Sequence, residues 1–258
     1  TVNDDDIRIF VINPGSTSTK LALYNNSHPK IEADYPTIDK ADDNIDTRLA
    51  LRRKILARFF EENSIDATSL QVIASRGGGG GNFYAGAYHI DKELVEHCFS
   101  YKTPHASSLG PVLAYELSEQ LGIPAYVYDA EGVNEFYRFA TLSGMAAFPV
   151  TPGSHTLNAK AAARLASAEL GGKYNDFNLI VCHMGGGIST SLHKKGRLVD
   201  STSDAYSPER SGGMPMMAMV NFTNACFSGE YTLSQLLHMQ IGGGGLAGYL
   251  GTSDLQEV

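Results

Sequence analysis

The residues best suited to chemistry lie near the start of the chain, in the segment Asn13-Pro-Gly-Ser-Thr-Ser-Thr-Lys20. This segment offers four hydroxyl side chains, one glycine and one ammonium group. Hydroxyls, a cation and closely spaced backbone N–H groups are the donors that bind a phosphate chain. The segment is not a Walker A loop, because no second glycine precedes Lys20 and no helical pattern follows it. It therefore predicts a phosphate-binding turn, with an ordinary Ser/Thr-rich hairpin as the alternative.

A second segment, Val181-Cys-His-Met-Gly-Gly-Gly-Ile-Ser189, has the same pattern of apolar strand, small-residue turn and second strand. Aligning Asn13 with His183 lays Gly15 on Gly185 without a gap. Glycines inside a strand–turn–strand pattern indicate that something approaches the backbone closely. Self-similarity of this kind predicts two related halves that face one cleft.

Three charged residues lie at the ends of predicted elements. Arg76 follows an apolar strand, and Arg210 lies in a short loop rich in turn-forming residues. A guanidinium in such a place can bind a carboxylate or a phosphate with two hydrogen bonds, although a solvated surface arginine is the alternative. Asp129 ends the apolar run 123–128. A carboxylate beyond a strand's carboxyl end can hold Mg²⁺ directly or through water, and a turn cap is its alternative.

Three of the eight histidines lie beside small residues at element ends: His105, His155 and His183. No two histidines have metal-binding H-x-x-x-H spacing, and no Cys/His cluster indicates zinc. Each alone could be structural, but together they suggest donors to phosphoryl oxygens. The other five have no comparable setting: His28, His89, His97, His193 and His238.

The composition narrows the classes of partner. The 258 residues carry a formal net charge of -8 without a long basic run, which argues against nucleic acid or an anionic membrane as the main partner. Three widely spaced cysteines favour a reducing cytoplasm without disulfides. The polar, acidic first residues do not resemble a signal peptide, and no apolar run approaches the ~20 residues that span a bilayer.

Strands alternate with helices along the chain, which predicts an α/β layered fold. We expect helices at 46–62, 93–99, 109–122, 158–170, 214–226 and 233–239, and a helix start at 252–258. Asp91 is the predicted N-cap of the second helix and Ser107 or Ser108 that of the third. An acidic loop is expected near 39–46. The glycines at 77–81 and at 242–245 could form phosphate loops or flexible joints, and a joint is favoured for 77–81.

A boundary is predicted near Pro149, Pro152 and Gly153, which divides the chain into domains 1–150 and 151–258. The first domain contains the first hairpin. The second contains the second hairpin and no later βα unit that would complete its sheet layer. We therefore expect the second domain to be incomplete in this chain.

Four motifs in order resemble the butyrate kinases: residues 12–20, 105–110, 183–189 and 207–213. These belong to the carboxylate kinases, which include the acetate kinases, within the actin/sugar-kinase/Hsp70 superfamily. The resemblance implies an α/β fold of two related actin/Hsp70-like (ribonuclease H-like) domains facing a cleft. It also implies ATP and Mg²⁺ as cofactors, a short-chain fatty acid substrate, an acyl phosphate product and a homo-oligomer in the cytoplasm.

The resemblance further implies a role for each matching residue. Arg76 and Arg210 would grip the carboxylate and the transferred phosphoryl group, and His155 would donate to the transition state. Asp129 would organise the metal together with Asn13, and His105 would lie on the substrate side. The phosphate hairpins would use the remaining set: Asn13, Ser16, Ser18, Lys20, His183, Gly185, Gly186 and Gly187.

Two departures from the family pattern qualify this reading. After Arg76-Gly-Gly, residues 79–84 read Gly-Gly-Gly-Asn-Phe-Tyr where the family has leucines and a proline. Family members also run further at the carboxyl end. A non-catalytic nucleotide- or carboxylate-binding fragment and a kinase for a branched-chain carboxylate are the alternatives. A sugar kinase fits poorly, since no motif offers the base that a hydroxyl acceptor requires.

Overall fold

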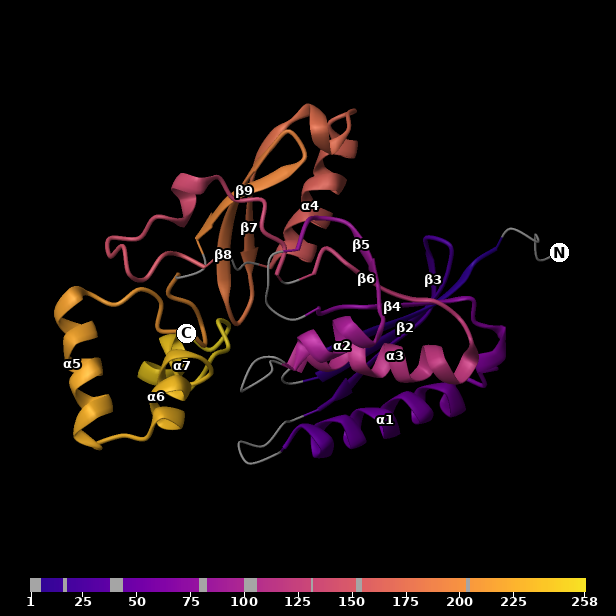
Figure 1. Ribbon diagram of the computed structural model, residues 1–258, viewed down its shortest axis with the longest axis horizontal. Helices are drawn as coiled ribbons and strands as arrows, with labels where there is room; N and C mark the ends of the chain where they lie inside the picture. The colour runs from indigo at the N-terminus through magenta and orange to yellow at the C-terminus, as the bar shows by residue number, and fades with distance from the viewer. Residues whose placement is uncertain are drawn as a thin grey trace. The chain divides into compact units, whose positions relative to one another are not determined.

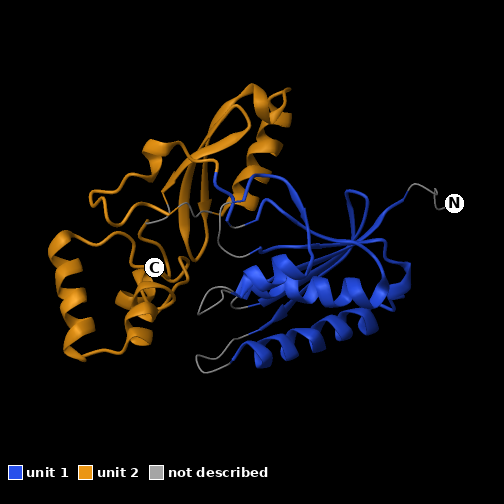
Figure 2. Ribbon diagram, viewed as in Figure 1, with its two compact units in different colours: residues 1–134 blue, residues 135–258 orange. Residues whose placement is uncertain are grey.

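The computed structural model describes residues 6–15, 18–37, 44–78, 83–99, 106–130, 132–151, 155–202 and 205–258. The chain forms two compact units, residues 1–134 and residues 135–258 (Figure 2). The domain ranges 1–150 and 151–258 inferred from the sequence stay a prediction. No helix in the described ranges is long and apolar enough to cross a membrane.

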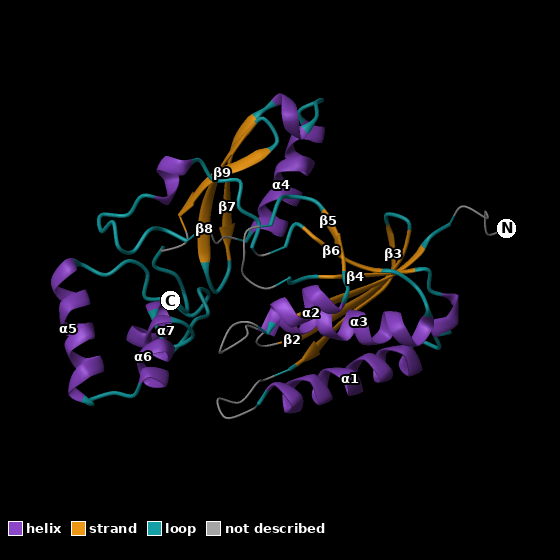
Figure 3. Ribbon diagram, viewed as in Figure 1, coloured by secondary structure: helices purple, strands orange, loops and turns teal. Residues whose placement is uncertain are grey.

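Unit 1 is built on a six-stranded sheet with the order β3-β2-β1-β4-β6-β5 (Figures 1 and 3). Its strands are β1 (Arg8–Pro14), β2 (Ser18–Asn25), β3 (His28–Pro36), β4 (Val72–Ser75), β5 (Ala87–His89) and β6 (Ala125–Tyr128). β1, β4 and β6 run parallel, whereas β1, β2 and β3 form an antiparallel meander. The carboxyl ends of β1, β4 and β6 therefore lie at the same edge of the sheet.

Three α-helices accompany this sheet: α1 (Ile45–Glu62), α2 (Lys92–Cys98) and α3 (Leu109–Leu121). Short 3-10 turns cover Ala67–Ser69 and Ala106–Ser108. α1 contacts β2, and α3 contacts β1, β4 and β6. Phe10 and Phe59 are both fully buried in the core, with ring centroids 5.6 Å apart. Alternate residues of β1 and β2 supply this core, which leaves the intervening side chains on the opposite face of the sheet.

Unit 2 contains a three-stranded antiparallel sheet of β7 (Asn178–Met184), β8 (Ile188–Lys194) and β9 (Arg197–Thr202). α4 (Thr156–Glu169) packs against β7. Two 3-10 turns cover Arg138–Thr141 and Tyr174–Asp176. The remaining helices are α5 (Met216–Ser228), α6 (Leu233–Gln240) and α7 (Gly245–Leu250).

Most predicted elements are confirmed within a few residues. Asp91 caps α2 as expected, because its Oδ1 accepts a hydrogen bond from the Leu94 N–H at 2.9 Å. Gly122 ends α3 in the left-handed region, with φ of 66°. Ser108 lies at the N-cap of α3 but makes no side-chain cap bond. Most of the predicted acidic loop, residues 38–43, and glycines 79–81 lie outside the described residues.

The expected helix start at 252–258 is wrong, because this segment forms turns. The Thr252 hydroxyl donates to Glu257 Oε2 at 2.6 Å and accepts from the Asp254 N–H at 3.1 Å. Such local side-chain bonds compete with helix formation. The glycine-rich stretch 242–245 leads instead into α7.

The sequence reading also missed β3 and β5. β3 has a proline at position 2 and at its last position, and it carries Lys30, Glu32 and Asp34. These charged residues alternate with Ile31, Ala33 and Tyr35, which face the core side. Prolines and charges are tolerated there because β3 is an edge strand, where one side of the backbone has no partner strand.

Candidate functional site

The first predicted phosphate turn lies between β1 and β2. Asn13 pairs with Lys20 across the hairpin, and the Gly15 N–H donates to the Ser18 carbonyl at 2.7 Å. Ser18 is the first residue of β2, whereas Ser16 lies outside the described residues. Arg52 of α1 is fully buried, and its Nη2 donates to the Gly15 carbonyl at 3.0 Å. A buried guanidinium thus anchors the turn from the helix side of the sheet.

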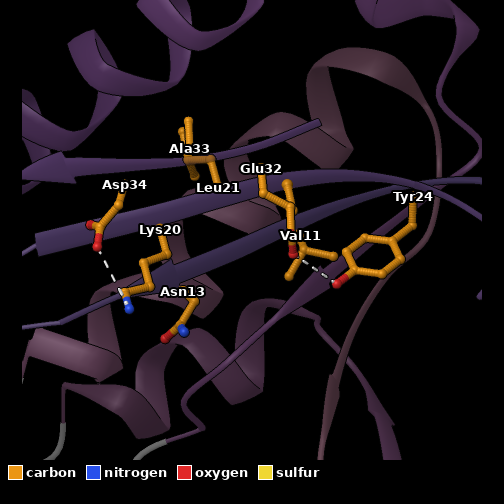
Figure 4. Close-up of a pocket in the computed structure, with 9 residues that line it drawn as sticks. Val11, Asn13, Lys20, Leu21, Tyr24, Glu32, Ala33 and Asp34 are labelled. Atoms are coloured by element: carbon orange, nitrogen blue, oxygen red, sulfur yellow. Dashed lines mark hydrogen bonds and ion pairs between the residues drawn. The ribbon is translucent and has the colours of Figure 1, made fainter. Parts of the chain in front are cut away.

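Lys20 lies on the opposite face of the hairpin, where its ammonium pairs with the Asp34 carboxylate of β3 at 3.6 Å. Both side chains are more than half exposed, at 62% and 52%. They line a shallow pocket of about 420 Å³ together with Asn13, Tyr24 and Glu32 (Figure 4). Exposed ion pairs contribute only about 0–1 kcal/mol, so a phosphate group can compete for this ammonium.

Arg76 follows β4 directly and is brought to the end of β1. Its N–H donates to the Ile12 carbonyl at 3.0 Å, and its Nη1 donates to Asn13 Oδ1 at 3.5 Å, a long hydrogen bond. Gly110 of α3 packs against the backbone of Arg76. A Cβ built at Gly110 would lie 2.4 Å from the Arg76 carbonyl oxygen. The helix can approach the strand end this closely only with a glycine. The structure therefore joins two predicted site residues, Asn13 and Arg76.

Asp129 lies at the same sheet edge, directly after β6. It is buried, with 2% of its surface exposed, and has a left-handed φ of 45°. Its Oδ1 accepts from the Gly86 N–H at 3.1 Å, and its own N–H donates to the Gly86 carbonyl at 2.9 Å. A non-glycine residue in this region is uncommon and often marks a functional position. His105, the predicted substrate-side histidine, lies outside the described residues.

The donor set of unit 1 suits Mg²⁺ bound with a nucleotide. Asp129 supplies a carboxylate and Asn13 an amide oxygen, both ligand types that Mg²⁺ accepts. Among the described residues, no three His, Cys, Asp or Glu side chains form a metal-binding group. Mg²⁺ in kinases keeps several waters and binds one or two carboxylates plus substrate phosphates, so one carboxylate is sufficient.

The second predicted turn joins β7 and β8 in unit 2. His183 pairs with Ser189 across the hairpin, and the Gly185 N–H donates to the Gly187 carbonyl at 3.1 Å. His155, just before α4, stacks on the His183 ring with centroids 3.8 Å apart and planes 13° apart. The His155 Nδ1 is 2.9 Å from the Ser189 Oγ. Two predicted histidines and the glycine turn thus form one cluster.

Arg210 lies directly against this turn. A Cβ built at Gly187 would be 2.7 Å from the Arg210 Cζ, and one at Gly186 would be 2.8 Å from Glu209 Oε2. The Glu209 N–H and the Ser207 hydroxyl both donate to the Gly186 carbonyl, at 3.1 and 2.8 Å. The close approach predicted for these glycines is therefore made by the 207–210 loop, and it brings Arg210 to the turn.

A third segment, residues 240–247, packs against the 207–210 loop and is hydrogen-bonded to it. The Gly242 N–H donates to the Glu209 carbonyl at 2.8 Å, and the Ser211 N–H donates to the Gln240 carbonyl at 3.1 Å. Gly245 has φ of 60°, and a Cβ there would be 1.8 Å from the Ser207 carbonyl oxygen. The sequence reading left open whether the glycines at 242–245 bind phosphate or form a joint. In the structure they pack against the Arg210 loop.

Sequence reasoning missed a buried polar network under β8. His193 is fully buried, with its Nδ1 2.5 Å from the Tyr174 hydroxyl and its Nε2 2.8 Å from the Ser191 Oγ. Nearby, the buried Lys160 ammonium pairs with Glu135 Oε2 at 2.6 Å. The alternation of Ser189, Ser191 and His193 on one strand face was the available signal for this network.

The unfolding free energy should reflect this burial of His193. Burial, followed by the Lys160 charge, lowers the pKa of the His193 imidazole from 6.5 to about 4. As pH falls, the unfolded chain therefore binds a proton on His193 at a higher pH than the folded protein does. The stability that the neutral ring contributes is lost as pH falls from about 6.5 towards 4. Chemical denaturation across this range should show a shallower pH dependence for His193→Gln than for the wild type. Equal slopes would contradict this, and His28→Gln, at an exposed site, is the control.

Replacing Arg52 should disturb the nucleotide binding that the family resemblance implies for the first turn. Arg52→Met keeps the volume of the side chain but removes the hydrogen bond to the Gly15 carbonyl. We expect an increase of about tenfold in KM for ATP and a loss of about 1.5–3 kcal/mol in unfolding free energy, typical of a charged hydrogen bond. Arg53→Met is the control, because that exposed helix residue pairs with Glu116 instead. An unchanged KM for ATP in Arg52→Met would contradict the anchoring role.

Comparisons with known proteins show which sequences and folds this chain resembles. Butyrate kinase 1 of Clostridium acetobutylicum is 36% identical over 261 residues, which cover 97% of this chain and 72% of that protein. No protein-family model matches the chain. The chain resembles a crystal structure of Porphyromonas gingivalis acetate kinase with a TM-score of 0.74, at 16% identity, over 97% of this chain and 72% of that one.

A propionate kinase from Francisella tularensis subsp. tularensis gives a TM-score of 0.72 at 17% identity, again over 97% of this chain and 72% of that one. At these low identities, the two solved structures show the fold alone. The α/β fold of this chain is therefore that of the acetate and propionate kinases, as the sequence predicted.

Proposed function

Because the chain belongs to the butyrate kinase family, we propose that it transfers the γ-phosphoryl group of ATP to the carboxylate of butyrate. The observation that carries this proposal is the 36% identity with Butyrate kinase 1 over 97% of the chain. The geometry supports it, since both segments form turns between antiparallel strands, with Arg76 bonded to Asn13 beside the first and Arg210 packed against Gly187 of the second.

The reaction suits these residues because it moves no proton. A carboxylate oxygen of butyrate attacks the γ-phosphorus, the bond from that phosphorus to the β–γ bridging oxygen breaks, and ADP leaves with the electron pair. A carboxylate is already a nucleophile, so no general base is required. The barrier lies in bringing an anion to a polyanion and in stabilising charge on the transferred group. Cations and hydrogen-bond donors lower that barrier.

We assign the first turn of unit 1 to the phosphate chain, with Asn13, Ser16, Ser18 and Lys20 as donors. Lys20 would exchange Asp34 for a phosphate oxygen. Arg76, at the end of β4, would neutralise the carboxylate and the transferred phosphoryl group. On the substrate side of this unit we assign His105.

Asn13 and Asp129 would hold Mg²⁺, directly or through water. The bound ion would neutralise phosphate charge, which is its usual contribution to phosphoryl transfer. Asp129 is suited to this role because the Gly86 N–H fixes its Oδ1 at a strand end.

In unit 2, we assign the donors to the transferred group to His155 and Arg210, and the second phosphate hairpin to His183 with the glycine turn. The glycine turn 185–187 would offer backbone N–H groups to phosphate, as small-residue turns do. Arg210 would act on the γ-phosphoryl group and the carboxylate. Its guanidinium already lies against Gly187, which places its charge at the turn before the reaction.

The test is the formation of an acyl phosphate by the chain. Protein, ATP and MgCl₂ are incubated with butyrate, and hydroxylamine traps the product as a hydroxamate. We expect hydroxamate with butyrate and less with propionate or isobutyrate, since one methylene or branch changes binding by about 1–3 kcal/mol. A preference for isobutyrate would assign the site to a branched-chain acid, and no hydroxamate with any acid would reject the proposal.

We also propose a cytoplasmic homo-oligomer. The family resemblance supports self-association, and the three cysteines are free thiols in the structure, as in reducing compartments. Light scattering after size-exclusion chromatography tests self-association. The mass of a single chain at micromolar concentration would contradict it.

A further inference from the structure

The His155–His183 stack has a neighbour to which no role has been assigned. We propose that Asn158 is a positioning residue that fixes the orientation and tautomer of the His183 imidazole at the glycine turn. This inference rests on the proposed function for its kinetic consequences, but its geometric content does not.

The hydrogen bond between Asn158 and His183 is the first observation. Asn158 lies in the first turn of α4, which packs against β7, and its Oδ1 is 2.9 Å from the His183 Nδ1. An amide oxygen only accepts hydrogen bonds, so the His183 Nδ1 must carry the hydrogen. The second ring nitrogen, Nε2, is then the one directed at a ligand.

The position of that second nitrogen is the next observation. A Cβ built at Gly185 would lie 3.4 Å from the His183 Nε2. The Nε2 therefore lies at the turn that we assign to phosphate. With Nδ1–H bonded to Asn158, the Nε2 of the neutral ring is an acceptor, and it becomes a donor for a phosphoryl oxygen when the ring takes up a second proton.

The His183 ring is held on two sides. His155 stacks on its face, with centroids 3.8 Å apart, and is itself bonded through Nδ1 to the buried Ser189 Oγ. This stack fixes the plane of the His183 ring. It does not distinguish the ring from one rotated by 180° about Cβ–Cγ, in which the nitrogens exchange places with carbons. The bond to Asn158 does distinguish them, because a ring carbon in place of Nδ1 could not bond the Asn158 Oδ1.

A purely structural role for Asn158 is poorly supported. Its side chain is exposed on a helix, where asparagine is a weaker helix former than alanine or leucine. Asn158 is therefore not the residue that helix stability alone would select. Its side-chain oxygen instead bonds the His183 ring.

The experiment compares Asn158→Leu, which has a similar shape and no acceptor, with Asn158→Asp, which keeps one. Asn224→Leu is the matched control, because Asn224 is an exposed asparagine on helix α5. Initial rates give kcat and the KM values for ATP and butyrate. ¹⁵N NMR of histidine-labelled protein reports the His183 tautomer, with His183→Gln identifying its signals.

We expect Asn158→Leu to lower kcat/KM for ATP by about 10- to 100-fold. Losses of this size are usual when the hydrogen-bond partner that orients a binding histidine is removed. The KM for butyrate should change less than threefold, and Asn158→Asp and Asn224→Leu should stay within about threefold of the wild type. In spectra of the neutral His183 ring, the Nδ1–H tautomer should dominate in the wild type and be lost in Asn158→Leu.

Wild-type kinetics and an unchanged His183 signal in Asn158→Leu would overturn the inference. Equal impairment in Asn158→Leu and Asn158→Asp would also overturn it, since the acceptor would then not matter. A wild type without acyl phosphate activity would reject the proposed function instead, and the NMR comparison would still decide the role of Asn158.

Discussion

Arg210→Ala should lower kcat for acyl phosphate formation by about 10²- to 10³-fold, the typical cost of removing one donor to the developing charge. The guanidinium lies against Gly187, and its loop is hydrogen-bonded to the Gly186 carbonyl through Glu209 and Ser207. The loop that carries the charge is thus bonded to the turn before substrate arrives. Steady-state kinetics with ATP and butyrate measure the effect.

One further variant separates charge from geometry, and another is a control. Arg210→Lys keeps the charge but cannot form two parallel hydrogen bonds, so we expect most of the loss to persist. Arg138→Ala removes an exposed arginine from the same unit and should leave kcat unchanged. Wild-type turnover in Arg210→Ala would show that this residue does not act on the transferred group.

Gly245→Ala should produce the second large effect, a loss of both stability and turnover. The added Cβ would lie 1.8 Å from the Ser207 carbonyl oxygen and 2.7 Å from the Arg210 carbonyl oxygen. Backbone cannot yield as a flexible side chain does, so the loop that carries Arg210 must move. Overpacking typically costs 1–3 kcal/mol, and the left-handed φ of 60° adds about 1–2 kcal/mol.

Gly229→Ala is the matched control for this substitution. Gly229 also has a left-handed φ, of 75°, but a Cβ there meets nothing within 4 Å. It should therefore show the conformational cost of about 1–2 kcal/mol alone, with kcat unchanged. Thermal unfolding and steady-state rates measure both variants. If Gly245→Ala behaved like Gly229→Ala, the packing of 242–245 against the Arg210 loop would not be required for activity.

The two hairpins could be predicted from the sequence because their signals are local. In each, an apolar strand leads into small turn residues and a second strand, which limits the chain to few conformations. The helices were predictable for the same reason, since the spacing of residues such as Leu56 and Phe60 marks one helix face. The strand ends carrying Arg76 and Asp129 followed from these elements.

The contacts that support the site could not be predicted, because they join residues far apart in sequence. Arg52 reads as one more basic residue on a helix, yet it is buried and holds the Gly15 carbonyl. His193 lacks the small neighbours that marked His105, His155 and His183. The packing of Gly245 against the Ser207 loop likewise depends on tertiary structure. Periodicity reveals which face of an element is buried, but not which partner covers it.

The central claim is that the carboxylate oxygen of butyrate attacks the γ-phosphorus of ATP, and ³¹P NMR with [¹⁸O₂]butyrate tests it most directly. The account predicts butyryl phosphate whose phosphorus is bonded to one ¹⁸O, visible as an isotope-shifted signal, together with ADP. Unlabelled inorganic phosphate, AMP with pyrophosphate, or ATP binding without any product would contradict it.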